Sequence, residues 1–127
     1  MSSSNNQILS YGLTNPSSFR QVYSFELREK EARRILDKYP DRIPIICESF
    51  GDVKLDKSKY LVPKDITVGQ FIYVLRKRVA LKSEQNIFVF VNNTIPSISS
   101  LISELYEQYK DPDNLLYLTV KTESVYG

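Results

Sequence analysis

Residues 57–78, KSKYLVPKDITVGQFIYVLRKR, carry the clearest structural signals of the chain, because a short strand, a proline and a capped helix can be read from them in turn. The first six, KSKYLV, include β-forming residues and stop at Pro63, which predicts a strand over residues 57–62. Thr67 and Gln70 have the spacing of a capping box, so a helix is expected to begin there and continue to about Arg78. The residues expected on its buried face recur at helical spacing: Val68, Phe71, Ile72 and Leu75.

The segments on both sides of this stretch complete an α+β fold. Residues 42–49, RIPIICES, predict a strand that forms a hairpin with residues 57–62. After the helix, the sequence predicts a strand over 86–91, a helix that is capped by Ser99 or Ser100 and ends at Tyr109, and a last strand over 115–122. This β-β-α-β-α-β order is that of a β-grasp fold with a mixed sheet.

Two additional helices are expected before the sheet. Ser18 and Gln21 have capping-box spacing and predict one short helical turn. Ser24 is the expected cap of a helix over Phe25–Lys38, whose acidic residues come early and whose basic residues come late, as the helix dipole favours. Residues 1–18 are rich in serine and asparagine and poor in apolar residues, which predicts a flexible polar arm.

The composition argues against several functional classes. The chain has 127 residues, a net charge of +2, one cysteine and no histidine. This charge is too small to indicate nucleic-acid binding, and no run is apolar for long enough to span a bilayer. The single cysteine excludes an internal disulfide and, since no secretory leader is visible, indicates a reducing compartment. Without a histidine or a glycine-rich phosphate loop, the sequence predicts no enzyme, no cofactor and no metal site.

Two local features leave alternative interpretations open. The basic run at 76–78 is either a solvated helix end or a docking site for an acidic partner or anionic lipid. Lys57 and Lys59 either protect an exposed strand edge from aggregation or flank an edge that pairs with an extended peptide. The interpretation of Cys47 is clearer. It alternates in register with apolar residues of its strand and is therefore expected to be a buried thiol.

Five parts of the chain carry a resemblance to a known family. They are YPDRIP at 39–44, KYLVP at 59–63, ITVGQF at 66–71 with RKR at 76–78, FVNN at 90–93 with IP at 95–96, and ESVYG at 123–127. In this order and spacing they resemble the autophagy ubiquitin-like modifiers of the GABARAP type, over residues 19–127. The resemblance implies a ubiquitin-like β-grasp domain with two additional N-terminal helices at 19–122. The arm at 1–18 would precede this domain, and a conjugation tail at 123–127 would follow it.

Members of that family are modifiers rather than enzymes. The resemblance implies that activating and conjugating enzymes join Gly127 to phosphatidylethanolamine and that a delipidating cysteine protease reverses the reaction. The protein is then expected in the cytoplasm as a monomer and, when lipidated, on autophagosomal or related vesicle membranes. There it would recruit autophagy receptors and adaptors that carry an aromatic-x-x-aliphatic motif, by β-edge addition. The alternative is an adaptor in membrane trafficking that binds such peptides without being conjugated.

The resemblance also implies a binding face on and around the predicted strand at 57–62. The aromatic-pocket group, expected to surround the partner's aromatic residue, is Glu31, Ile35, Pro44, Lys59, Leu61 and Leu115. The aliphatic-pocket group is Tyr60, Val62, Pro63, Ile66, Phe71 and Val74. The basic positions expected to meet acidic residues of the partner are Arg42, Lys57 and Arg78. Because side chains alternate along a strand, Lys59 and Leu61 are expected on one face and Tyr60 and Val62 on the other, which agrees with this division into two groups.

The chain departs from the family pattern at three places. Leu115 replaces the usual phenylalanine, so we expect the aromatic pocket to differ in shape. The turn after Glu48 is shorter, and the arm before Phe19 is longer. Most family members are also made with residues beyond the glycine, whereas Gly127 is last here, so either the gene encodes a ready-made form or the chain was trimmed.

Overall fold

The computed structural model describes residues 18–50, 55, 58–79, 81 and 85–124. Three sequence predictions lie outside these residues: the polar arm, the basic position Lys57 and the conjugation site Gly127. The binding face and the helices around it are described almost completely.

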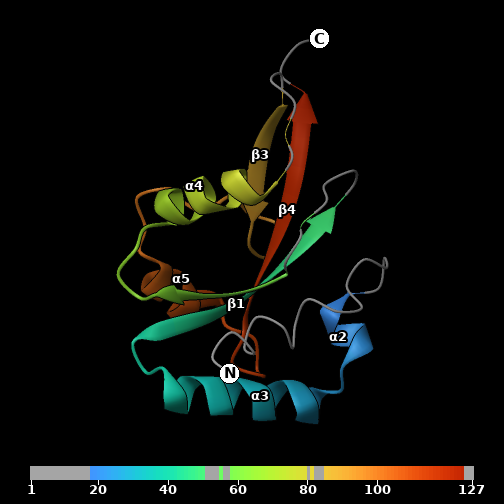
Figure 1. Ribbon diagram of the computed structural model, residues 1–127, viewed down its shortest axis with the longest axis vertical. Coiled ribbons are helices and arrows are strands. Elements are labelled where there is room, and N and C mark those ends of the chain that lie inside the picture. Colours follow the sequence, from blue (N-terminus) through green and yellow to red (C-terminus); the bar gives the residue numbers. More distant parts are fainter. Residues whose placement is uncertain (1–17, 51–54, 56–57, 80, 82–84, 125–127) are drawn as a thin grey trace.

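Four strands form one mixed sheet in the order β2-β1-β4-β3. They are β1 (Arg42–Phe50), β2 (Lys59–Pro63), β3 (Gln85–Phe90) and β4 (Leu116–Ser124). The last strand, β4, lies in the interior of the sheet, parallel to β1 and antiparallel to β3, while β2 pairs antiparallel with β1 (Figure 1). The predicted α+β class and β-grasp arrangement are therefore confirmed.

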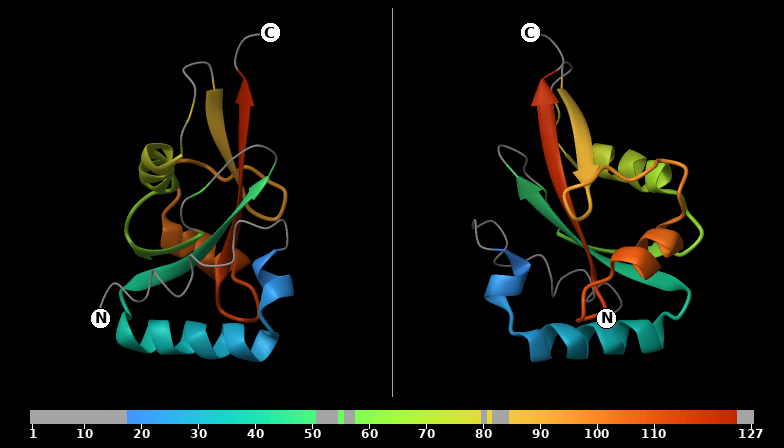
Figure 2. Two further views of the ribbon diagram at one scale, coloured as in Figure 1. Left: turned by 45° about the vertical axis from the view of Figure 1, so that its right-hand side comes forward. Right: turned by 180° about the vertical axis from the view of Figure 1, so that it is seen from behind.

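Helices cover both faces of the sheet. They are α2 (Phe19–Val22), α3 (Phe25–Lys38), α4 (Val68–Arg78) and α5 (Ile102–Tyr109). Figure 2 shows α4 and α5 on one side of the sheet, α2 on the other, and α3 across its lower end. The main core lies under α4 and α5 and includes Ile43, Ile45 and Cys47 of β1. Ile46 points the opposite way, because side chains alternate along a strand, and packs in a second cluster with residues of α2 and α3.

Side-chain caps begin three of the helices as the sequence predicts. The Thr67 hydroxyl accepts a hydrogen bond from the Gln70 N–H (3.1 Å), and the Gln70 side chain accepts one from the Thr67 N–H (2.8 Å). Ser18 and Gln21 form the same reciprocal pair at α2. The Ser24 hydroxyl caps α3 by accepting from the N–H of Leu27 (3.2 Å). These caps satisfy backbone donors that a helix start would otherwise leave unpaired.

The cap predicted for the last helix is wrong. Neither Ser99 nor Ser100 caps α5, because Leu101 occupies the cap position and donates its N–H to Glu104 (2.9 Å). The backbone before α5 instead pairs with the start of α4: the Ser100 carbonyl accepts from the Val68 N–H (2.8 Å). A long-range backbone ladder thus overrides the local capping preference of serine.

Strand boundaries also differ from the prediction by one or two residues, and those of β2 and β4 bear on the site. The second strand begins at Lys59 and includes Pro63, so it starts two residues later than residues 57–62 suggest. The last strand runs to Ser124 rather than to Thr122, because Glu123 and Ser124 pair with the first residues of β3. Glu123 and Ser124, predicted to be tail, therefore belong to the sheet.

A buried ion pair holds α3 against the loop that precedes β4. The Arg28 guanidinium donates to Asp113 (2.6 Å), whose side chain is fully buried. Asp113 also accepts from the Tyr117 hydroxyl (2.6 Å) and the Leu115 N–H (2.8 Å). Burial works against the charge of Arg28, but the bonds to Tyr117 and Asp113 outweigh it and raise the Arg28 pKa above its usual value.

We expect Asp113→Ala to lower the free energy of unfolding by about 3 kcal/mol, because it leaves the buried Arg28 charge with only the more distant carboxylate of Asp111, at 3.9 Å. Urea unfolding monitored by circular dichroism measures the change. The control is Glu29→Ala on the same helix, which removes the exposed ion pair with Arg33 and should cost less than about 1 kcal/mol. Equal, small effects of the two variants would contradict a tethering role for Asp113.

Candidate functional site

Strand β2 is one of the two outer strands of the sheet and carries the backbone of the candidate site. Its inner side pairs with β1, and no strand of the described residues pairs with its outer side. The Cys47 N–H donates to the Ser58 carbonyl (2.6 Å), so Cys47 and Ser58 are a hydrogen-bonded pair of the antiparallel ladder. Such pairs recur at every second residue, so the backbone groups of Tyr60 and Val62 point toward β1. The backbone groups of Lys59 and Leu61 point away from it, toward the open side. An extended chain can pair with those outward groups.

The aromatic-pocket group gathers where β2 faces α3. Lys59 and Leu61 lie opposite Ile46 and Pro44 of β1, and the Lys59 ammonium lies 3.2 Å from the carboxylate of Glu31 on α3. Ile35 and Leu115 are each only 1% exposed, so they form the buried back of this group. The half-buried members, Glu31 and Leu61, are the ones that a ligand can touch directly.

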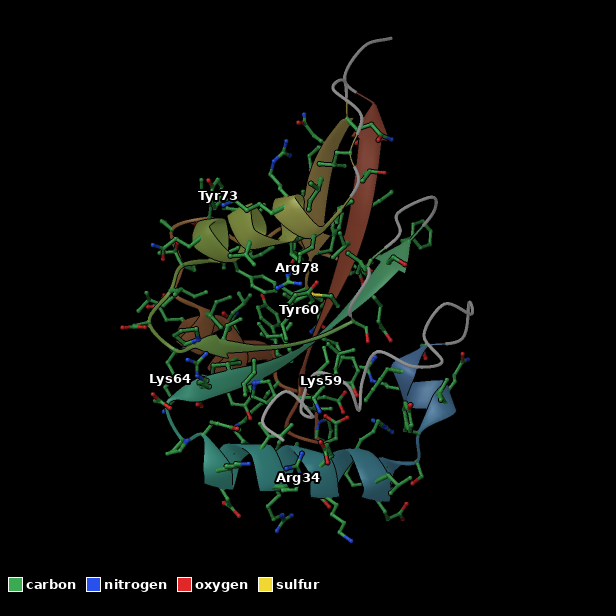
Figure 3. The ribbon with its side chains drawn as sticks, in the orientation of Figure 1. Arg34, Lys59, Tyr60, Lys64, Tyr73 and Arg78 are labelled. Carbon is green, nitrogen blue, oxygen red and sulfur yellow. The ribbon has the colours of Figure 1, made fainter. Side chains whose placement is uncertain are left out.

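The Lys59–Glu31 ion pair sets the electrostatics at this edge. Burial lowers the pKa of Lys59 to about 8, although the charge and hydrogen bond of Glu31 act to raise it. Burial also acts to raise the Glu31 pKa, but hydrogen bonds from Arg34 (2.7 Å) and the charge of Lys59 outweigh it, so that pKa falls below its usual value. Figure 3 shows Lys59 between β2 and α3, with Arg34 on the helix below. Two cations thus share one carboxylate beside the open edge.

Most of the aliphatic-pocket group lies on the opposite face of the sheet, between β2 and α4, while strand alternation places Pro63 at the end of β2 on the same face as Leu61. The ring of Tyr60 packs edge-on against Phe71 of α4, with ring centroids 5.6 Å apart. Tyr60, Val62 and Phe71 are buried in the main core. Val74 is 41% exposed, and Pro63 and Ile66 are half-buried. The group therefore has a rigid buried back and an accessible apolar mouth.

The described basic positions lie on two different elements. Arg42, at the start of β1, reaches the edge itself, because its guanidinium donates to the carbonyl of Leu61 (3.3 Å). Arg78 is exposed at the end of α4, above Tyr60 in the view of Figure 3. Sequence reasoning missed Arg34, although its i,i+3 spacing from Glu31 is a local signal for an ion pair.

The lone thiol and the basic helix end have different environments. Cys47 is 1% exposed, and burial strongly raises the pKa of its thiol, so the predicted core thiol is confirmed.

Arg76, Lys77 and Arg78 are all exposed in the last turn of α4. The Lys77 ammonium lies 4.6 Å from the ring centre of Tyr73, an exposed neighbour of Val74. Within the described residues, no helix has the length and apolar character needed to span a membrane.

Comparison with known proteins decides the family. Residues 27–127 match the family described as "Autophagy protein Atg8 ubiquitin like". The chain belongs to this Atg8 family. Autophagy-related protein 8 of Pichia angusta is 52% identical to it over an alignment of 114 residues that covers 87% of this chain and 91% of that protein. Autophagy-related protein 8 of Mycosarcoma maydis is 49% identical over an alignment of 114 residues that covers 87% of this chain and 97% of that protein.

Solved structures of Atg8 proteins have the same fold. The crystal structure of Trypanosoma brucei ATG8 superposes with a TM-score of 0.80 at 41% identity and covers 89% of this chain and all of that one. Plasmodium falciparum Atg8, solved with a peptide of Plasmodium falciparum Atg3, gives 0.76 at 37% identity and covers 85% of this chain and 98% of that one. The resemblance to autophagy ubiquitin-like modifiers is therefore confirmed.

The low pKa of Lys59 predicts a pH dependence of stability. In the folded protein Lys59 loses its proton near pH 8, whereas in the unfolded chain it keeps it to about 10.5. Because the unfolded state then binds more protons, this group should increase the free energy of unfolding as pH rises between these values. The gain should be about 3 kcal/mol at pH 10, since each pKa unit corresponds to about 1.4 kcal/mol and about two units lie between pH 8 and 10.

The measurement is urea unfolding from pH 7 to 10 of the wild type and of Lys59→Met, which keeps the apolar stem. Taking the difference between the two proteins at each pH removes the titration of the tyrosines. A difference that does not change with pH would show that Lys59 titrates normally.

Proposed function

We propose that this Atg8-family protein is a conjugated modifier and adaptor of autophagy. Gly127 is joined to phosphatidylethanolamine, and the lipidated protein recruits receptors and adaptors by adding their aromatic-x-x-aliphatic segments to β2. The observation that carries the adaptor role is the open edge of β2 between two residue groups on opposite faces of the sheet.

The spacing of such a motif suits these two faces. Successive side chains of an added strand point to opposite sides, so two residues three positions apart project to different faces. The aromatic residue would then reach Leu61 and Glu31 on the α3 side, and the aliphatic residue would reach Ile66 and Val74 on the α4 side. The backbone of the peptide would pair with the outward groups of Lys59 and Leu61.

Charge adds to this selectivity. Lys59, Arg34 and Arg42 lie at or beside the edge, and Glu31 is the carboxylate that pairs with Lys59 and Arg34. Acidic residues next to the motif would be attracted to this excess of positive charge. Because part of the attraction passes through solvent, it should weaken as salt increases.

The conjugation role uses the C-terminal end of β4. This strand ends at Ser124 and leaves three residues, which extend at most about 10 Å. Glycine has no Cβ, so the carbonyl carbon of Gly127 is open to attack. An activating enzyme would adenylate this carboxyl and pass it to a thiol, and the lipid amine would displace that thiol to form an amide. The protein is the acyl donor in this scheme and not the catalyst.

The partners follow from this chemistry. Plasmodium falciparum Atg8 has been solved with an Atg3 peptide, and we propose that this chain binds a corresponding conjugating enzyme. An activating enzyme and a delipidating cysteine protease complete the cycle. The two acyl chains of the lipid anchor the protein stably, where one chain would hold it only marginally. The protein would move between the cytoplasm and autophagosomal or related vesicle membranes.

Gly127→Ala should greatly reduce lipid attachment, because the added methyl group crowds the reacting carbonyl. The test incubates each protein with activating and conjugating enzymes, ATP and vesicles that contain phosphatidylethanolamine, and follows the gel shift and the mass of the product. Val125→Ala is the control and should be lipidated like the wild type. Equal lipidation of Gly127→Ala would rule out this role for the glycine, and no lipidation of any form would favour the non-conjugated adaptor.

Leu61→Ala should weaken the binding of an aromatic-x-x-aliphatic peptide about tenfold, because it removes accessible apolar surface from the edge. Isothermal calorimetry measures the affinity. Leu27→Ala makes the same chemical change at a 57% exposed position of α3 and should bind like the wild type. Leu61 is preferable to Tyr60 as a target, since Tyr60 packs on Phe71 and its truncation would damage the core. Unchanged affinity of a folded Leu61→Ala protein would refute binding at this edge.

A further inference from the structure

A cavity of about 400 Å³ lies just past the end of β2 and outside both pocket groups. Its apolar lining includes Leu36 of α3 and Ile43 of β1. Its charged lining consists of three basic residues and one acidic residue: Arg42, Lys64, Lys110 and Glu107. Segments far apart in the sequence thus bring three cations to one hollow.

The charges around this cavity favour an anion. Three bases and one carboxylate give the lining a net charge of +2. Glu107 is only loosely paired with Lys110, at 3.8 Å, and its side chain is 73% exposed, so it neutralises little of this charge. The hydroxyl of Tyr106, which also lines the cavity, already donates to the Asn114 carbonyl (2.8 Å). An acidic group on a short apolar stem matches this combination of basic and apolar walls.

The position of the cavity identifies the source of that anion. Lys64 directly follows Pro63, and the Arg42 guanidinium is bonded to the outer carbonyl of Leu61, so the cavity adjoins the open edge. Figure 3 shows Lys64 at the end of β2 away from the tip of β4, where the tail leaves the sheet. A headgroup of the membrane attached to that tail is therefore remote from it, whereas a peptide on β2 leaves the edge beside it.

The order of the two pocket groups along β2 indicates which end of a bound peptide lies next to the cavity. The aromatic-pocket group meets β2 near Lys59, at its start, and the aliphatic-pocket group includes Val62 near its end and Ile66 just after it. A motif whose aromatic residue comes first then runs parallel to β2. Its C-terminal flank, after the aliphatic residue, passes next to Lys64.

We propose that this cavity is a subsite for an acidic side chain, glutamate or phosphoserine, two or three residues after the aliphatic residue of the bound motif. The subsite rests on the proposed binding of peptides to β2. Lys64 and Lys110 contribute its charge together with Arg42, and a phosphoserine should bind more tightly than a glutamate because it carries about two negative charges.

The experiment uses three peptides with the same aromatic-x-x-aliphatic core. One has a neutral Gly-Ser flank, one has glutamate at the second and third positions after the aliphatic residue, and one has phosphoserine there. Calorimetry at low salt should show about fivefold tighter binding for the glutamate peptide than for the neutral one. Lys64→Gln with Lys110→Gln should remove this gain and leave the affinity for the neutral peptide unchanged.

A charge-matched control is Lys30→Gln with Lys38→Gln, two exposed lysines of α3 that do not line the cavity. This control protein should keep the full gain. If the acidic flanks give no gain, or the same gain in the Lys64 and Lys110 double variant, the subsite is wrong although the edge still binds. If the neutral peptide itself fails to bind the wild type, the proposed function fails at its first step and the subsite fails with it.

Discussion

The central parallel pair of strands constrains everything else in this protein. β1 and β4 use their backbone groups on both sides, so only β2 and β3 keep an outer edge in the described sheet. The pairing therefore exposes β2 next to α3. It also directs the end of β4 toward one end of the molecule, where the tail begins (Figure 1). The open edge of β2 and the position of the end of β4, on which the two proposed roles depend, thus both follow from placing the last strand beside the first.

The N-terminal helix α3 takes part in the site as well as in the fold. Glu31 and Ile35 supply one wall beside β2, and the Lys59–Glu31 contact joins the two elements directly. The position of α3 depends in turn on Arg28, whose bond to Asp113 spans 85 residues of sequence. A loss of that ion pair would disturb the aromatic side of the edge while leaving the core under α4 intact. Helix α3 therefore completes the candidate binding face of a ubiquitin-like sheet.

Local signals were readable from the sequence, and long-range contacts were not. The Thr67–Gln70 box and the Ser24 cap formed as expected, because their partners lie within three residues. The serine cap of α5 failed because backbone pairing with the start of α4 competes with it. The burial of Lys59, and with it a pKa near 8, depends on a helix 28 residues away. The members of the binding face came from the family resemblance, while strand alternation alone separated its two sides.

The two proposed roles use opposite ends of the molecule. The tip of β4 lies at one end of the molecule, whereas Lys64, just after β2, lies toward the other (Figure 3). When the tail is fixed to a bilayer, a ligand on β2 leaves the edge on the side away from the attachment point. If both proposals hold, basic residues there would meet partners rather than the headgroups of the same membrane, because charges are screened beyond about 8 Å at physiological salt. The proposed subsite beside Lys64 would then act only when a peptide occupies the edge, and its charge would act on the choice of peptide.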